Sequence, residues 1–374
     1  INKRIGDEPQ GSPHPKAVYE PELLSDDYHS MHSYKKNYNA EGTELVRAEI
    51  KRLQCRGILE PIPYGTGKIK LNYVLARRKG SSKVRLCVDA VNMNRYLKPN
   101  MKSLPSVNEL HGKIRQGKCE FMSALDLKDA YYVMKMSNRI NNLLFIEQDG
   151  QQYTWKNSPY GCSTLPAAFV EMIESIFGDL GDKVFCYFDD ILICAETLEE
   201  HNRILKEVVR RCNEYRLPLN LSKSHLCCKR LKYLGMYIDK DNIYPDEDKV
   251  VGLKEAENPV DVKSLLGFLG LLNFNRQFMH KFNDDTNTLH KMISKYNKLK
   301  GKFKPPDQLF VNEEIDKLKK NLHNMVALCH CPNNINEHEW VVITDSSQVG
   351  MGAVLAYKDE DGELRPIATF RSLY

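Results

Sequence analysis

The sequence has no long apolar run, no cysteine pair at metal-binding spacing and no internal repeat. Among its 374 residues, no stretch approaches the ~18 apolar residues of a membrane span. The first residues, Ile1–Asp7, lack the apolar core of a secretion signal. These absences predict an intracellular, cytoplasmic protein with no membrane partner. The chain also lacks an initial Met, which indicates a processed or shortened product.

The 11 cysteines are odd in number, and their only clusters are Cys227-Cys228 and Cys329-His330-Cys331. Neither cluster has the Cys-x-x-Cys spacing of a zinc site, so reduced and mostly buried thiols are expected. A hydrophobic content of 42% supports real cores, and the length allows two or three domains. The formal net charge of +5 is only a weak indication of a polyanionic partner.

Two adjacent acids, Asp189 and Asp190, stand between two short apolar runs rich in β-branched and aromatic residues. Such runs are typical of buried strands, so the pattern predicts a hairpin with both carboxylates at its tip. Adjacent carboxylates repel one another and resist desolvation. Either they protrude into water as a polar turn, or they hold divalent cations.

A third acid, Asp126, ends another strand-like run that begins at Phe121. Helical patterns follow from Pro166 to Gly178 and after the Thr197-x-x-Glu200 capping box. The resulting order β-α-β-β-α-β suggests a split ferredoxin-like sheet, in which Asp126 and the hairpin tip are neighbours. Upstream, a helix is expected from Thr43 as its cap to Gly57, with Val46, Ile50 and Leu53 on one face.

Three clustered carboxylates meet the requirement of two-metal phosphoryl transfer. Mg²⁺ prefers oxygen ligands and keeps several waters, so a few aspartates and the substrate phosphates suffice. The basic tip of a second predicted hairpin, residues 77–83, would then neutralise a triphosphate. Taken alone, that charge run is more typical of a solvated loop.

Six motifs in order resemble a reverse transcriptase of LTR retrotransposons, closest to the gypsy class. They begin with the fingers segment Val84–Asp89 with Asn92-x-Asn94 and the palm motif Leu125-Asp126-Leu127 with Ala130-Tyr131. Ser158–Gly161 with Leu165–Phe169 and the hairpin Tyr187–Leu192 follow. Tyr233–Ile238 resembles the primer grip, and Phe268–Phe278 resembles the thumb.

The resemblance implies roles for individual residues. Asp126, Asp189 and Asp190 would be the catalytic metal ligands for two Mg²⁺ ions, with Mn²⁺ as a possible substitute. Tyr131 would be the steric gate against a ribose 2′-hydroxyl, and Leu234 with Gly235 would form the primer grip. The nucleotide-binding set would be Arg78, Arg85, the Leu127 carbonyl, Tyr131, Tyr160 and Lys223. Lys223 stands where the family carries a basic residue for pyrophosphate, although it could equally be a solvated lysine.

The sequence departs from the family pattern in three places. Tyr160 stands where relatives have Phe or Gln, and Arg78 stands where many have Lys. The segment after the thumb, Phe310-Val311-Asn312, lacks the usual Trp.

The tail resembles the opening strands of an RNase H domain, with Asp345 matching its first metal ligand. Because the later acids are missing, this chain alone is not expected to have RNase H activity. Two or three strands are too few to bury a face alone, so the tail is expected to be disordered, docked or completed in trans.

The implied fold is an α/β (α+β) right-hand polymerase with fingers, palm and helical thumb, plus an RNase H-like fragment. The expected parts are an N-terminal extension that wraps or dangles (1–42), fingers and the start of the palm (43–120), palm with an inserted fingers segment at about 137–153 (121–245), thumb and linker (246–330), and the incomplete RNase H-like fragment (331–374).

The implied activity is RNA-directed DNA polymerase, with an RNA template, a DNA or RNA primer, RNA–DNA hybrid and dNTPs as partners. A homodimer or a longer Pol-derived partner, and virus-like particles for an active element, are further expectations. The rival is a non-catalytic structural subunit or a domesticated nucleic-acid-binding derivative, which the retained aspartate triad disfavours. An RNA-making polymerase is disfavoured by the bulk of Tyr131.

Overall fold

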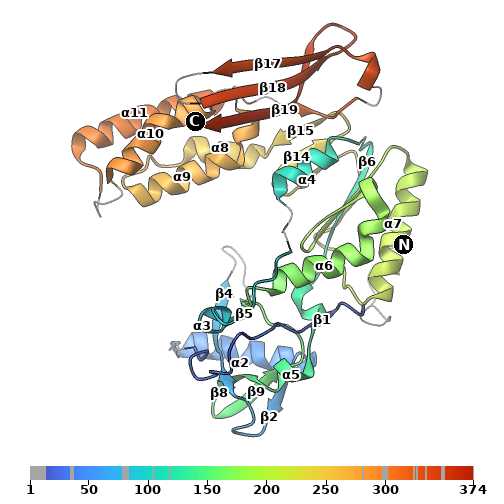
Figure 1. The fold of residues 1–374 in the computed structure, drawn as a ribbon, viewed down its shortest axis with the longest axis vertical. Helices are drawn as coiled ribbons and strands as arrows, with labels where there is room; N and C mark the ends of the chain where they lie inside the picture. The colour runs from blue at the N-terminus through green and yellow to red at the C-terminus, as the bar shows by residue number, and fades with distance from the viewer. Residues whose placement is uncertain are drawn as a thin grey trace. The chain divides into compact units, whose positions relative to one another are not determined.

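The structure is a computed structural model that describes residues 14–33, 38–77, 84–102, 104, 106–117, 119–279, 282–296, 302–322, 325, 327–332, 335–346 and 350–373 (Figure 1). The chain forms two compact units. The first contains residues 1–106, 124–193 and 202–226, and the second contains residues 107–123, 194–201 and 227–374.

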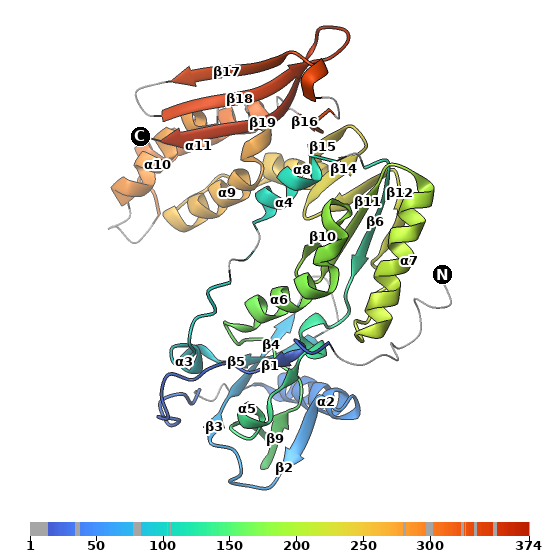
Figure 2. The same ribbon diagram turned by 45° about the vertical axis from the view of Figure 1, so that its right-hand side comes forward.

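A four-stranded sheet carries the predicted acidic residues. Its strand order is β10-β11-β6-β12, and its members are β6 (Phe121–Asp126), β10 (Val184–Tyr187), β11 (Asp190–Ala195) and β12 (His225–Cys228). Helix α6 (Leu165–Phe177) lies in the chain between β6 and β10, where it follows an inserted segment, and helix α7 (Leu198–Glu214) connects β11 to β12. Both helices lie beside the sheet in the two views (Figure 2). This arrangement confirms the predicted β-α-β-β-α-β unit.

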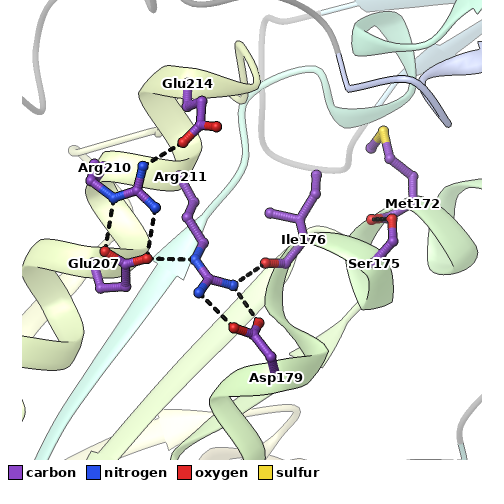
Figure 3. A network of polar contacts seen from close by, with 8 residues as sticks. All are labelled: Met172, Ser175, Ile176, Asp179, Glu207, Arg210, Arg211 and Glu214. Atoms are coloured by element: carbon purple, nitrogen blue, oxygen red, sulfur yellow. Dashed lines mark hydrogen bonds and ion pairs between the residues drawn. The ribbon is translucent and has the colours of Figure 1, made fainter.

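Arg211 joins the two helices by an ion-pair network (Figure 3). Its guanidinium donates to the Ile176 carbonyl near the end of α6, to Asp179 just beyond it, and to Glu207 one turn back on α7. Arg210, on the same helix, pairs with Glu207 and Glu214. The Arg211 side chain is 16% exposed and that of Arg210 is 59% exposed. Arg211 therefore stabilises the packing of α7 on α6, whereas Arg210 belongs to the solvated face.

Helix α2 (Ala40–Cys55) buries Val46, Ile50 and Leu53, as its pattern predicted. It begins three residues before the expected cap. The Asn39 side chain accepts a hydrogen bond from the Gly42 amide, while Thr43 donates its hydroxyl to the Asn39 carbonyl. Thr43 was thus the wrong cap, because Asn39 satisfies the first free amide and the helix accommodates Gly42 in its first turn.

The other elements of the first unit are short. They are the sheet β2-β9-β8-β3 and the hairpin β4-β5, with strands β2 (Leu59–Ile62), β3 (Ile69–Lys70), β4 (Asn72–Arg77), β5 (Val84–Asp89), β8 (Leu144–Gln148) and β9 (Gln151–Trp155), and the helical turns α3 (Val91–Asn94), η1 (Ala130–Val133), α5 (Asn138–Asn141) and η2 (Gly178–Lys183).

The described part of the N-terminal extension packs within the first unit. Strand β1 (Val18–Tyr19) pairs in parallel with β7 (Lys135–Met136), and Tyr19 is 2% exposed. Its hydroxyl lies 2.7 Å from the Thr164 hydroxyl at the start of α6. Of the two expected behaviours, wrapping is the one observed for these residues.

Four helices of the second unit share one apolar core. They are α8 (Glu247–Glu255), α9 (Val262–Phe274), α10 (Phe282–Tyr296) and α11 (Pro305–Asn321). Leu265, Leu289 and Ile315 are fully buried in this core. Asp261 caps α9 by accepting from the Ser264 amide, and the Ser264 hydroxyl completes the reciprocal box. The short turn η3 (Arg276–Phe278) follows α9.

Two antiparallel sheets and one short helix complete the second unit. The first sheet is β13 (Arg230–Tyr233), β14 (Met236–Asp239), β15 (Asn242–Pro245) and β16 (Leu328–Cys329), and the helix is α4 (Val107–Ile114). The second sheet is β17 (Trp340–Ser346), β18 (Gly350–Lys358) and β19 (Leu364–Leu373), with η5 (Ile335–Glu337) just before it. The Thr369 hydroxyl of β19 donates to the Gln277 carbonyl of η3, and Ile367 is buried. The described tail is therefore a sheet that contacts η3 of the second unit. Of the three expected states (disordered, docked or completed in trans), this contact corresponds to the docked one.

Candidate active site

The adjacent acids lie at the tip of the β10–β11 hairpin. Tyr187 pairs with Asp190, so Phe188 and Asp189 form the two-residue turn. Phe188 has a φ of 53°, the left-handed conformation that such tight hairpin turns require. The Leu127 amide donates to the Asp189 carbonyl at 2.9 Å, which fixes the tip beside the end of β6. The predicted proximity of Asp126 to the hairpin tip is confirmed.

The three carboxylates influence each other electrostatically. Loss of hydration raises the pKa of Asp189, and the charge of Asp126 raises it further. Loss of hydration, then the charges of Asp189 and Asp126, raise the pKa of Asp190 to about 6. Ionisation of Asp189 and Asp190 is therefore less favourable than in water, and a bound cation would offset that cost.

Asp126 already has two partners of its own. The Asn220 side-chain amide donates to its Oδ2 at 2.9 Å, and the Lys223 Nζ lies 3.2 Å from its Oδ1. Within the described ranges, no group of three or more His, Cys, Asp and Glu side chains is gathered so that it could hold a metal ion. The oxygen donors nevertheless have the chemistry that a hard divalent cation requires. Their role as metal ligands stays a prediction.

Tyr131 lies in an aromatic cluster immediately after β6. Its ring centroid is 5.1 Å from that of Tyr160 and 5.3 Å from that of Phe169 on α6. The Arg85 guanidinium of β5 stands 4.4 Å over the Tyr160 ring. Burial raises the pKa of Tyr131 and of Tyr160 to about 12, so both phenols stay neutral at physiological pH. The structure thus brings three predicted nucleotide contacts, Arg85, Tyr131 and Tyr160, into one cluster.

A close backbone contact holds Tyr160 in this cluster. The Val88 amide donates to the Tyr160 carbonyl at 2.7 Å. The next residue, Gly161, has a φ of +130°, and a Cβ atom there would lie 2.2 Å from the Val88 carbonyl oxygen. Only glycine fits this position. The Ser-Pro-Tyr-Gly segment of the sequence is therefore a chain turn that aims Tyr160 at Arg85.

Asp129 fixes the turn that presents Tyr131, and sequence reasoning gave it no role. It has a φ of 53°, and its carbonyl accepts from the Tyr132 amide at 2.9 Å. Its carboxylate pairs with Arg56 and lies 3.6 Å from the Arg52 guanidinium, both on or next to α2. The basic residues of α2 gave no local signal, because their partner lies more than seventy residues along the chain.

The remaining predicted residues belong to the second unit or lie outside the described residues. Arg78 lies outside them. Leu234 and Gly235 form the turn between β13 and β14 in the second unit, with φ of 47° and 77°. A Cβ atom at Gly235 would lie 2.3 Å from the Lys249 Nζ. Asp345 is exposed on β17 in the same unit, where it pairs with Gly352.

Comparison with known proteins identifies the part of the chain that carries these features. Residues 77–238 match the sequence profile of the family described as reverse transcriptase (RNA-dependent DNA polymerase). The Tf2-3 transposon polyprotein of Schizosaccharomyces pombe is 29% identical over 293 residues, which cover 78% of this chain and 21% of that protein. The Tf2-7 transposon polyprotein of the same organism is 28% identical over 293 residues, which again cover 78% of this chain and 21% of that protein. The chain therefore spans about a fifth of the length of these relatives.

Solved structures share the fold. A foamy viral protease–reverse transcriptase in complex with double-stranded DNA superposes with a TM-score of 0.78 at 19% identity, covering 97% of this chain and 72% of that one. The same viral protein in complex with an RNA/DNA hybrid gives a TM-score of 0.76 at 19% identity, covering 100% of this chain and 47% of that one. The fold is that of a retroviral reverse transcriptase polymerase.

Among the residues that the structure describes, the helices are too short or too polar to span a membrane.

Proposed function

We propose that this chain is an RNA-directed DNA polymerase of an LTR retrotransposon, because residues 77–238 match the reverse transcriptase family and the chain is similar to the Tf2 transposon polyproteins. It extends a primer 3′-hydroxyl with dNTPs on an RNA or DNA template. The observation that carries the proposal is the placement of Asp126 beside the Asp189–Asp190 hairpin tip, with the Tyr131–Tyr160–Arg85 cluster in the same unit.

The three aspartates would hold the divalent cations, for which we propose Mg²⁺, with Mn²⁺ as a substitute. Such ions activate a hydroxyl for in-line attack and stabilise the charge on the leaving oxygen. The raised pKa values of Asp189 and Asp190 support this assignment, because a cation would offset both the loss of hydration and the mutual repulsion that raise them. The primer itself supplies the nucleophile, so no nucleophilic side chain is needed.

The surrounding residues would bind and orient the nucleotide. Arg85 carries a fixed positive charge toward the triphosphate, and its stacking on Tyr160 limits its freedom. Tyr131, held by Tyr160 and Phe169, excludes a ribose 2′-hydroxyl by its bulk. The Lys223 ammonium, now 3.2 Å from Asp126 Oδ1, can donate a proton to the departing pyrophosphate.

The proposed partners follow from the relatives. The foamy viral structures contain double-stranded DNA and an RNA/DNA hybrid, and we propose the same duplexes for this chain. The turn at Leu234–Gly235 would be the primer grip, and helices α8–α11 would form the thumb. We further propose that Asp345 belongs to an RNase H-like fragment that is inactive in this chain alone.

Primer extension on a defined RNA template tests the proposal. Changing Asp126 or Asp189 to Asn should reduce extension by at least about a hundredfold, because each change removes charge stabilisation at the reacting centre. Template–primer affinity should stay near that of the unmodified protein. Asp182→Asn, which changes an exposed acid of η2, serves as the matched control and should retain full extension.

Two outcomes would contradict the proposal. One is extension by Asp126→Asn above a few per cent of the unmodified rate. The other is tight template–primer binding with no extension by the unmodified chain, which would favour a non-catalytic nucleic-acid-binding subunit.

A further inference from the structure

We propose that Asn220 is a positioning residue that orients the Asp126 carboxylate for cation binding. The proposal rests on the polymerase function proposed above and adds a residue that acts through Asp126. Its basis is the 2.9 Å hydrogen bond from the Asn220 Nδ2 to Asp126 Oδ2.

The backbone around Asn220 is bound to the end of β6. The Asn220 amide donates to the Asp126 carbonyl at 2.8 Å, and Leu219 forms a β-bridge with Leu127. The Lys128 amide donates to the Pro218 carbonyl at 2.7 Å. These contacts place the Asn220 side chain beside Asp126 independently of the side-chain hydrogen bond itself.

The turn that follows Asn220 also contacts Asp126, through Ser224 and Lys223. The Ser224 hydroxyl donates to the Asn220 carbonyl at 2.9 Å, and the Asp126 amide donates to the Ser224 hydroxyl at 3.2 Å. Lys223, within this turn, brings its ammonium to Asp126. Residues 218–224 and the end of β6 are thus one connected assembly.

The orientation of the Asn220 amide is fixed by its neighbour. The Ser222 hydroxyl donates to Asn220 Oδ1 at 2.9 Å. Because an ionised carboxylate can only accept, the NH₂ group of Asn220 must face Asp126 Oδ2, which leaves Asn220 Oδ1 to accept from Ser222. The amide therefore acts as a donor to the carboxylate, held in place by Ser222.

Asn220 and Lys223 act on Asp126 in different ways. The lysine is a cation that competes with any metal ion for the carboxylate charge. The neutral amide fixes one oxygen without neutralising the charge, so its hydrogen bond is compatible with a bound cation. Groups that hydrogen-bond to ligating carboxylates in this way typically contribute about 10- to 100-fold in metal affinity or activity.

Binding of Mn²⁺, measured by electron paramagnetic resonance on the protein without nucleic acid, tests the role directly. Asn220→Leu keeps the size of the side chain and every backbone bond but removes the donor. It should raise the Kd for Mn²⁺ about tenfold. Ser222→Ala, which releases the amide, should raise it by a smaller factor. Asn213→Leu, the same change on α7, is the matched control and should leave the Kd unchanged.

Three further readouts separate positioning from folding. Thermal unfolding and template–primer affinity should be unchanged in Asn220→Leu, and the activity deficit should be larger at limiting than at saturating Mn²⁺. Equal Mn²⁺ affinity in Asn220→Leu and the unmodified protein would overturn the proposal. So would equal affinity in Ser222→Ala if Asn220→Leu does not fold. If Asn220→Leu weakens Mn²⁺ binding but the unmodified chain extends no primer, the positioning role stands and the polymerase function fails.

Discussion

Tyr131 shows how single residues of this chain depend on distant neighbours. Its ring contacts Tyr160 and Phe169, which come from a loop and from helix α6. The turn beneath it begins at Asp129, a left-handed residue held by Arg56. A side chain confined on several sides discriminates by shape, because it cannot move aside for one extra oxygen atom.

If Tyr131 is the gate, Tyr131→Val should relax discrimination against rNTPs. Its kcat/KM for rNTPs should rise about tenfold or more relative to dNTPs, because removing a steric contact admits the 2′-hydroxyl. Single-nucleotide incorporation with matched dNTP and rNTP provides the measurement. Tyr64→Val, at a position 82% exposed, is the control. An unchanged dNTP/rNTP ratio would exclude Tyr131 as the gate.

At the scale of elements, Arg211 connects α6 and α7, the two helices beside the β10-β11-β6-β12 sheet (Figure 3). It donates to the Ile176 carbonyl and pairs with Asp179 and Glu207 from a largely buried position. Arg211→Gln should lower the free energy of unfolding by about 1.5–3 kcal/mol, the usual contribution of hydrogen bonds to charged groups. Urea unfolding provides the measurement.

The neighbouring Arg210 offers a matched control for Arg211. Its ion pairs with Glu207 and Glu214 are exposed and screened by water, so Arg210→Gln should lower the free energy of unfolding less than Arg211→Gln does. Equal losses for the two variants would show that the bridge to α6 contributes nothing beyond surface charge.

Helix α4 carries a histidine whose burial makes stability depend on pH. His111 is fully buried; burial, and then the nearby Arg115 charge, lower its pKa from 6.5 to about 4. Between pH 4 and pH 6.5, His111 therefore binds a proton in the unfolded chain but not in the folded chain. The stabilising contribution is complete above pH 6.5 and declines as pH falls toward 4, by at most about 1.4 kcal/mol per unit.

His111→Leu should remove this part of the acid sensitivity. Urea unfolding midpoints measured between pH 7 and pH 4 should fall less steeply in His111→Leu than in the unmodified protein. His290→Leu, at an exposed position of α10, controls for the loss of a histidine. Parallel pH profiles for all three proteins would rule out His111 as the source.

The sequence predicted those features that depend on local pattern. The hairpin at Asp189–Asp190, helix α6 after Pro166 and the β-α-β-β-α-β order all follow from apolar periodicity and turn residues. The start of α2 was missed because Asn39, rather than Thr43, makes the capping bond.

Contacts between distant segments left no such pattern. Asn220 and Asp126 are 94 residues apart, and Arg56 and Asp129 are 73 residues apart. Neither pair has a spacing that a helix or strand period would indicate, so only the folded chain reveals them. Asp189 and Asp190 were singled out because they stand between two apolar strand-like runs, and the family resemblance then implied their role as metal ligands.

At the scale of the whole molecule, charge placement matters more than total charge. A net charge of +5 over 374 residues is modest. Binding to a duplex would then depend on cations gathered along the contact surface rather than on the overall field. Lys263 of α9 and Arg276 of η3 are exposed, and we predict that both meet the duplex backbone. Lys281, for which we predict the same contact, lies outside the described residues.

Template–primer binding should therefore weaken with salt in a way that counts these contacts. The logarithm of the binding constant should fall linearly with the logarithm of salt concentration, with a slope of about −0.9 per phosphate contact on B-form DNA. Lys263→Gln should make the slope shallower by about 0.9. Arg210→Gln should not, because Glu207 and Glu214 already neutralise that charge. Hybrids are recognised by shape and 2′-hydroxyl groups, so duplexes of different sequence should bind alike. Salt-independent binding, or strong preference for one sequence, would mean that base contacts rather than the backbone determine the affinity.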